Sequence, residues 1–164
     1  MTAIRNFFRS AVLALFFLHV FASSGVQTSY AAEAIKFASE QMVIHSASGE
    51  RKLTVELAIS ALQREHGLMF RKSMPADHGM LFDFGTTRPV LMWMKNTPLP
   101  LDMLFLDAKG AVVSIQENAV PYSEAIIDSR APVKYVIELN GGTAAKLGLK
   151  VGDKVSSATI DRTL

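Results

Sequence analysis

Cysteine is absent from the 164 residues of the chain, and tryptophan occurs only once, at Trp93. Without cysteine, neither a disulfide-rich scaffold nor a thiolate metal site can form. Three enzyme motifs are also missing: the G-x-S-x-G turn of α/β-hydrolases, the phosphate-binding G-x-x-x-x-G-K-[ST] loop and the H-E-x-x-H zinc motif. Hydrophobic residues make up 49% of the chain, which excludes a disordered protein because so apolar a sequence can bury a core.

The N-terminal segment has the layout of a secretory signal. Arg5 and Arg9 precede an uncharged apolar run, Ala11–Ala22, and small and polar residues follow it. This run is well short of the about 20 residues that a membrane-spanning helix needs. We therefore predict that residues 1–31 are a cleaved signal and that the protein is exported, to the periplasm or the extracellular space. The alternative is an uncleaved amphipathic anchor.

Cleavage of this signal gives a measurable N-terminus. Small-x-small sites end at Ala31 and Ala34, so the mature protein is expected to begin near Ala32 or Ile35. N-terminal sequencing of the secreted protein should find a first residue between Gly25 and Ile35. Recovery of intact Met1 from a detergent-extracted membrane fraction would contradict the prediction.

Removal of the signal leaves a domain that is formally neutral. The whole chain has 17 basic and 15 acidic residues, a net charge of +2. Arg5 and Arg9 are the only basic residues before position 32, and every acidic residue lies after it. Nucleic-acid binding needs Lys and Arg clustered on one face. We therefore expect no nucleic-acid partner, and membrane contact only through an uncleaved signal.

The remaining residues, 32–164, have the pattern of one domain built from short strands. Arg51–Ala58 alternates apolar and polar residues, and with Met42–Ala47 it predicts a hairpin. Ser60 and Gln63 have capping-box spacing and Gly67 follows, which predicts a two-turn helix over residues 61–66. Further strands are expected at Gly79–Phe84, Pro89–Met94, Leu101–Leu106, Ala111–Glu117, Tyr135–Asn140 and Val155–Ile160.

A second short helix is expected to begin with Thr143 as its cap and to end at Gly148. The sequence shows no long helices alternating with strands, so a doubly wound parallel sheet is not expected. We predict an α+β, mostly β fold: a compact antiparallel barrel-like domain with about eight short strands and two short helices.

The most unusual stretch lies between Met92 and Asp102. If its flanking strands pair as a hairpin, Lys95 lies opposite Asp102 and shares a face with Trp93. A register shifted by one residue instead places Lys95 opposite Leu101 and separates the two charges. Both registers stay open at the level of the sequence.

Trp93, Lys95, Asn96 and Asp102 are therefore the candidate site. An indole ring offers a flat stacking surface, and nearby polar groups supply fixed contacts, which suits a small ligand such as a carbohydrate. The structural alternative is that Trp93 fills the core while Lys95 and Asp102 form an ion pair. Two other functions remain open: a hydrolase or lyase with Asp102 and Lys95 as acid and base, and an envelope structural or interaction protein.

No metal or cofactor is expected. Six of the eight methionines lie between Met69 and Met103, a cluster typical of core packing, although methionine also binds Cu(I). The histidines after the signal, His45, His66 and His78, have no chelating spacing among them. We assign all three to structural roles.

Four segments of the chain carry a family resemblance: Val55–Phe84, Met92–Asp107, Ile115–Pro121 and Val136–Gly142. They resemble the uncharacterised family known as domain of unknown function 192, and the similarity extends from about Leu53 to Val155. The resemblance implies a small exported or membrane-associated protein with a compact, mostly β fold and no assigned activity. Arg64 and Arg71 belong to the matching positions and are added to the site as charged contacts.

Overall fold

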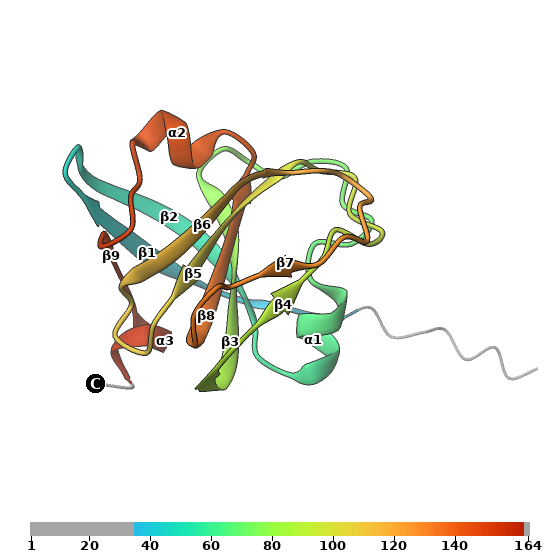
Figure 1. The fold of residues 1–164 in the computed structure, drawn as a ribbon, viewed down its shortest axis with the longest axis horizontal. Helices are drawn as coiled ribbons and strands as arrows, with labels where there is room; N and C mark the ends of the chain where they lie inside the picture. Colours follow the sequence, from blue (N-terminus) through green and yellow to red (C-terminus); the bar gives the residue numbers. More distant parts are fainter. Residues whose placement is uncertain (1–34, 163–164) are drawn as a thin grey trace, which may run out of the picture. The chain divides into compact units, whose positions relative to one another are not determined.

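The computed structural model describes residues 35–162, which form a curled, mostly β fold (Figure 1). The predicted signal, residues 1–31, lies outside the described residues. Within them, no helix has the length and apolar character needed to cross a membrane. The elements are β1 (Ala38–Ser46), β2 (Gly49–Ala58), α1 (Ala61–His66), β3 (His78–Arg88), β4 (Leu91–Met92), β5 (Leu101–Leu106), β6 (Val112–Ala119), β7 (Ile127–Asp128), β8 (Val133–Asn140), α2 (Thr143–Leu147), β9 (Lys154–Ser157) and α3 (Ala158–Asp161).

Seven strands form the main sheet, in the order β6-β5-β8-β3-β2-β1-β9, and β4 pairs with β7 in a small second sheet. Every pair is antiparallel except β2 with β3, which are parallel and joined through α1. The sheet curls until its edges meet, with a bridge between Ala111 and Lys154. The prediction of a mostly β, barrel-like fold is confirmed, and the parallel pair is an addition to it.

The closing seam requires glycine at position 110. Gly110 has φ +75°, and a Cβ atom there would lie 2.2 Å from the carbonyl oxygen of Val155. A hydrogen bond joins the two edges at this point, since the Val155 amide donates to the Gly110 carbonyl oxygen at 2.8 Å. A side chain would therefore push the edges apart.

Two apolar clusters lie on opposite faces of the main sheet. Every strand of that sheet contributes to the first cluster, which fills the inside of the curl and includes Val55, Leu104 and Ile137. The second lies on the other face of the central strands and includes Met80 and Met103. Residues from the 90–99 segment and from the turn after α1 pack against this second face. The candidate site lies in that covering layer.

Local signals predicted the first half of the chain well. The α1 helix spans Ala61–His66, and the Ser60–Gln63 capping box is present in both directions. Hairpin β1–β2 also forms as predicted. The strand expected at Pro89–Met94 is reduced to the two residues of β4, because its partner is the equally short β7.

The C-terminal part needs two corrections. Gly142, not Thr143, is the N-cap of α2, and no side chain caps that helix from within it. The last strand ends at Ser157, whose hydroxyl accepts from the Ile160 amide and begins a third helix, α3, that the sequence pattern did not predict. Gly148 ends α2 in a left-handed conformation as expected.

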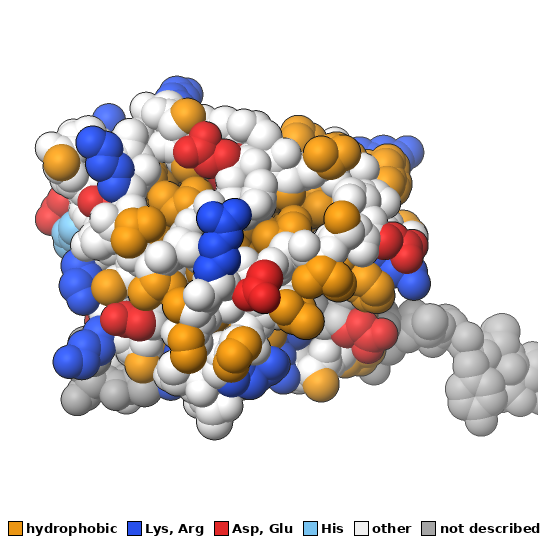
Figure 2. Space-filling model, in the orientation of Figure 1, with side chains coloured by type: hydrophobic (Ala, Val, Ile, Leu, Met, Phe, Trp, Pro, Cys, Tyr) orange, Lys and Arg blue, Asp and Glu red, His pale blue; other side chains and the backbone are white. Residues whose placement is uncertain are grey.

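The face of the molecule in Figure 2 carries Lys and Arg side by side with Asp and Glu, among scattered apolar side chains. No field of one sign covers this face. The absence of a nucleic-acid partner remains a prediction, and the mixed charge is what a formally neutral domain is expected to show.

Candidate functional site

Trp93 and Lys95 lie on either side of a buried anchor. Met94 is fully buried, whereas the Trp93 side chain is 40% exposed. The Met94 amide donates to the Ser123 carbonyl at 2.9 Å, and the Thr97 amide donates back to the Met94 carbonyl at 3.1 Å, which makes a tight turn. Asn96 completes this turn with φ 55°, a conformation that asparagine tolerates. Lys95 therefore belongs to a turn and Trp93 directly precedes it, so neither residue lies in a hairpin strand.

A second turn, directly after α1, holds the first one in place. The Phe70 amide donates to the Asn96 carbonyl at 2.8 Å, and the Asn96 amide group contacts the Met69 sulfur at 3.8 Å. Residues about 27 positions apart are thereby joined, which fixes the end of α1 opposite Trp93. Asn96 acts here through its backbone and side chain as a link between the turns.

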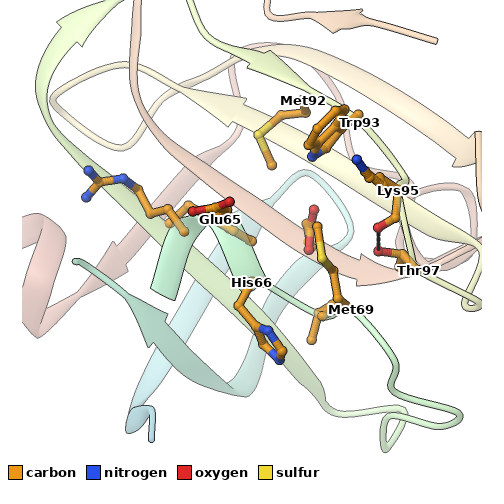
Figure 3. Close-up of a pocket in the computed structure, with 12 residues that line it drawn as sticks. Glu65, His66, Met69, Met92, Trp93, Lys95 and Thr97 are labelled. Carbon is orange, nitrogen blue, oxygen red and sulfur yellow. Dashed lines mark hydrogen bonds between the residues drawn. The ribbon is translucent and has the colours of Figure 1, made fainter. Parts of the chain in front are cut away.

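Between the two turns lies a surface hollow that we call the Trp93 groove. Its volume is about 370 Å³, and its walls come from α1, the turn after it and the Trp93 segment. Figure 3, a close-up of the narrower pocket that adjoins the groove, shows Glu65 and Met69 across from Trp93 and Lys95, with the His66 ring pointing away. The lining residues of the groove are Ile35, Leu62, Glu65, His66, Met69, Trp93, Lys95 and Asn96.

A narrow space, the inner cavity, adjoins the groove and shares five of its lining residues, Trp93 and Lys95 among them. Its volume is only about 30 Å³. Its walls are mixed: apolar and sulfur-bearing side chains, among them Leu68, Phe82 and Met92, alternate with polar and charged ones. One further residue, Glu138 of β8, also lines the cavity.

Glu138 is the residue that the sequence analysis missed. Its side chain is on the covered outer face of the sheet, and the residue is only 4% exposed. Burial raises the pKa of the Glu138 carboxyl to about 8, with no neighbouring charge or hydrogen bond from the described residues to offset it. The alternation of β8 places Glu138 on the same face as Val136. A carboxyl group on a face that also has an apolar residue was the signal in the sequence for a buried acidic side chain.

The indole of Trp93 already contacts a cation. The Lys95 ammonium nitrogen lies 5.0 Å from the centre of the Trp93 ring, within the range of a cation–π contact. Lys95 and Trp93 are therefore brought together, as the candidate site requires. The Thr97 hydroxyl donates to the Lys95 carbonyl at 3.2 Å and stiffens this turn (Figure 3).

The two arginines of the candidate site are occupied by structural contacts. Arg64 lines the inner cavity, but its guanidinium donates to the carbonyl oxygens of Ile59 and Asp83. Arg71 does not line the groove or the cavity, and it makes a two-pronged ion pair with Glu56 at 2.5 and 2.6 Å. That pair lowers the pKa of Glu56 and raises the pKa of Arg71, through the hydrogen bond between them.

Asp102 is separated from the other candidate residues. It pairs with Leu139 of β8, and neither of the two hairpin registers with Lys95 forms. The Asp102 carboxylate is fully buried and accepts from three backbone amides, those of Asn118 at 2.8 Å, Gly142 at 3.1 Å and Ala144 at 2.7 Å. Asp102 thus caps α2 from a distant strand, which explains why Thr143 is not needed as a cap.

Among the described residues, no group of three or more His, Cys, Asp or Glu side chains is arranged to hold a metal ion.

Asn96 and Lys95 line the groove together with Trp93, and Arg64 contributes to the adjoining cavity. The structure therefore brings together four of the six candidate residues and adds Glu65, His66, Met69 and Glu138 to them.

Comparison with known proteins shows the family of this fold. Residues 43–157 match the sequence profile of the DUF192 family, described as Uncharacterized ACR. A Sinorhizobium meliloti crystal structure, provisionally described as a transcription regulator, has 59% identity and a TM-score of 0.74 and covers 76% of this chain and 98% of its own. A Novosphingobium aromaticivorans protein of unknown function has 35% identity and a TM-score of 0.71, and the match covers 77% of this chain and 89% of that protein. No curated protein matches the chain.

Proposed function

The chain belongs to the DUF192 family, which is described only as uncharacterised, and from the site we propose that it is an exported module that binds a small ligand, with carbohydrates as the ligand class. One observation carries the proposal. The only tryptophan of the chain is 40% exposed at the wall of a groove of about 370 Å³. That volume is within the usual range of small-molecule sites, about 300–1,000 Å³.

The chemistry around the ring supports a sugar. A pyranose has apolar C–H faces that stack on an aromatic ring, and its hydroxyls need both donors and acceptors. Lys95 supplies a donor, Glu65 an acceptor and Asn96 both, and all three line the groove. The turn that carries Trp93 is held by backbone hydrogen bonds on both sides, so little ordering is needed when a ligand binds.

Other functions have less support. The carboxylate oxygens of Asp102 accept hydrogen bonds from three backbone amides. This structural role gives no support to a hydrolase or lyase that uses Asp102 as an acid or base. The charge of the chain does not favour a DNA-binding regulator, because the residues after position 31 include equal numbers of acidic and basic side chains. A protein partner has one supporting observation: Leu62 and Phe70 are 61% and 65% exposed, near the groove.

Tryptophan fluorescence tests the proposal directly, because Trp93 is the only tryptophan. Oligosaccharides that occupy the groove are expected to shift the emission of the mature protein with saturation, and a parallel panel of small anions serves as comparison. By calorimetry, Trp93→Ala should weaken the same ligand roughly tenfold, the order of magnitude of an aromatic stacking contact. Tyr122→Ala, an exposed aromatic outside the groove lining, should leave binding unchanged. Absence of any shift across the panel would reject the sugar site and favour the protein partner.

A further inference from the structure

The inner cavity contains a carboxyl group that the fold itself does not use. Glu138 lies in β8 between Met80 of β3 and Met103 of β5, and side chains paired across neighbouring strands share one face. It is 4% exposed, and its carboxyl receives no hydrogen bond from the described residues that would lower its pKa. A carboxyl group held in so desolvated a place costs free energy when no donor or cation engages it, most of all when it is ionised. Its persistence at a cavity wall points to a partner that comes from outside the chain.

The charged side chains around Glu138 do not supply an ion-pair partner for its carboxyl group. Arg64, Glu65, His66 and Lys95 are the other titratable groups that line the cavity. The Arg64 guanidinium is bound to two carbonyl oxygens, and the His66 ring lies near Phe37 and Phe70, at centroid distances of 6.4 and 6.1 Å. The Lys95 ammonium lies over the Trp93 ring. None of these cations is paired with Glu138.

The cavity walls suit an ammonium group in size and in chemistry. A volume of about 30 Å³ has room for roughly one or two groups the size of water. The indole of Trp93 attracts cations through its π face, and the 5.0 Å contact with Lys95 shows that face holding one. Met69 and Met92 add polarisable sulfur at the same wall.

We propose that the inner cavity recognises an ammonium group, so that the ligand of the Trp93 groove is an amino sugar whose amine pairs with Glu138 while its ring stacks on Trp93. The inference rests on the proposed binding function and names the ligand class of the same site. The ligand displaces the Lys95 ammonium from the indole, because the sugar ring takes that face and the two ammonium groups repel each other at one site. Glu138 is the anchoring residue, and Glu65 at the exposed rim contacts the sugar hydroxyls.

Pairing with an amine couples binding to proton release. The free Glu138 carboxyl is protonated at pH 6, since its pKa is about 8, and it must ionise to pair with an ammonium group. An amine that is already charged at pH 6 therefore expels one proton when it binds. A neutral sugar does not need this ionisation and expels none.

Three probes with the same ring test the inference: glucosamine, N-acetylglucosamine and glucose. Calorimetry at pH 6, in two buffers of different ionisation enthalpy, measures affinity and proton release for the mature protein. Glucosamine is expected to bind at least tenfold more tightly than the other two and to release about one proton, as an ion pair in a buried site implies. Equal affinity for all three would leave the sugar site standing and overturn the amine assignment. Failure of all three to bind would overturn both.

Variants separate anchoring from a structural role. Glu138→Gln keeps the size of the side chain and should reduce glucosamine to the affinity of glucose and abolish the proton release. Glu65→Gln, at the exposed rim, should keep the amine preference. Lys95→Gln, which leaves the core untouched, should strengthen glucosamine binding relative to glucose binding, since it removes the competing ammonium. A glucosamine preference that survives Glu138→Gln, or that Lys95→Gln leaves unchanged, would contradict the proposal.

Discussion

Asp102→Asn is expected to lower the free energy of unfolding by about 3 kcal/mol or more. The carboxylate is fully buried, and its two oxygens accept from the amides of Asn118, Gly142 and Ala144. Asparagine keeps one acceptor oxygen and places an NH₂ donor where the other oxygen was. A backbone amide left without an acceptor costs about 1–3 kcal/mol, and bonds to a charged acceptor are the stronger ones. The substitution therefore loosens α2 and the loop before it.

Urea unfolding of the wild-type protein and of Asp102→Asn measures this difference in unfolding free energy. Glu117→Gln is the matched control, since Glu117 is an exposed acidic residue next to Asn118, and surface changes of that kind stay within about 0.5 kcal/mol. A loss below about 1 kcal/mol for Asp102→Asn would show that the three amides find other acceptors. In that case the capping role assigned to Asp102 would be wrong.

The second large effect is a change of stability with pH that depends on Glu138. Its pKa is about 8 in the folded protein against an ordinary value of 4.5. The folded state therefore binds the proton more tightly than the unfolded state does. The stabilisation is complete below about pH 4.5 and is lost as the pH rises through 8. At about 1.4 kcal/mol per pKa unit, the loss between pH 5 and pH 8 is roughly 4 kcal/mol.

Glu138→Gln isolates this contribution, because the amide is neutral at every pH in the range. The difference in unfolding free energy between the variant and the wild-type protein is expected to shift by roughly 4 kcal/mol from pH 5 to pH 8, in favour of the variant. Urea titrations at pH 5, 6, 7 and 8 provide the measurement, with Glu65→Gln following the wild-type curve. Parallel curves for Glu138→Gln and the wild-type protein would mean that the carboxyl is not desolvated in the folded state.

The candidate site was predictable where its residues are neighbours in the chain. Trp93, Lys95 and Asn96 lie within four positions, and one turn keeps them together whatever the rest of the fold does. Asp102 is only six residues beyond Asn96 but belongs to a central strand of the main sheet. Its side chain points to the α2 region, because the partners of β5 are β6 and β8 and not the Trp93 segment.

Glu138 was not predictable for a different reason. The strand period places it opposite Ile137 and Leu139, a pattern that usually means a face open to water. That face is covered by the 90–99 segment and by the turn after α1, which are some 40 and 70 residues away in the sequence. Its burial and raised pKa therefore depend on contacts that no local pattern contains.

The sequence by itself determined the features that arise within a few residues: the capping box of α1, the β1–β2 hairpin, the glycines at turns and the mostly β character of the domain. Each depends on backbone geometry and on side chains close in the chain. Only the tertiary structure decided that β2 and β3 run parallel, that Asp102 caps a helix 42 residues away and that Glu138 meets Trp93 at one cavity. Those outcomes depend on which surfaces bury one another when the sheet curls, and long-range burial is a property of the whole fold.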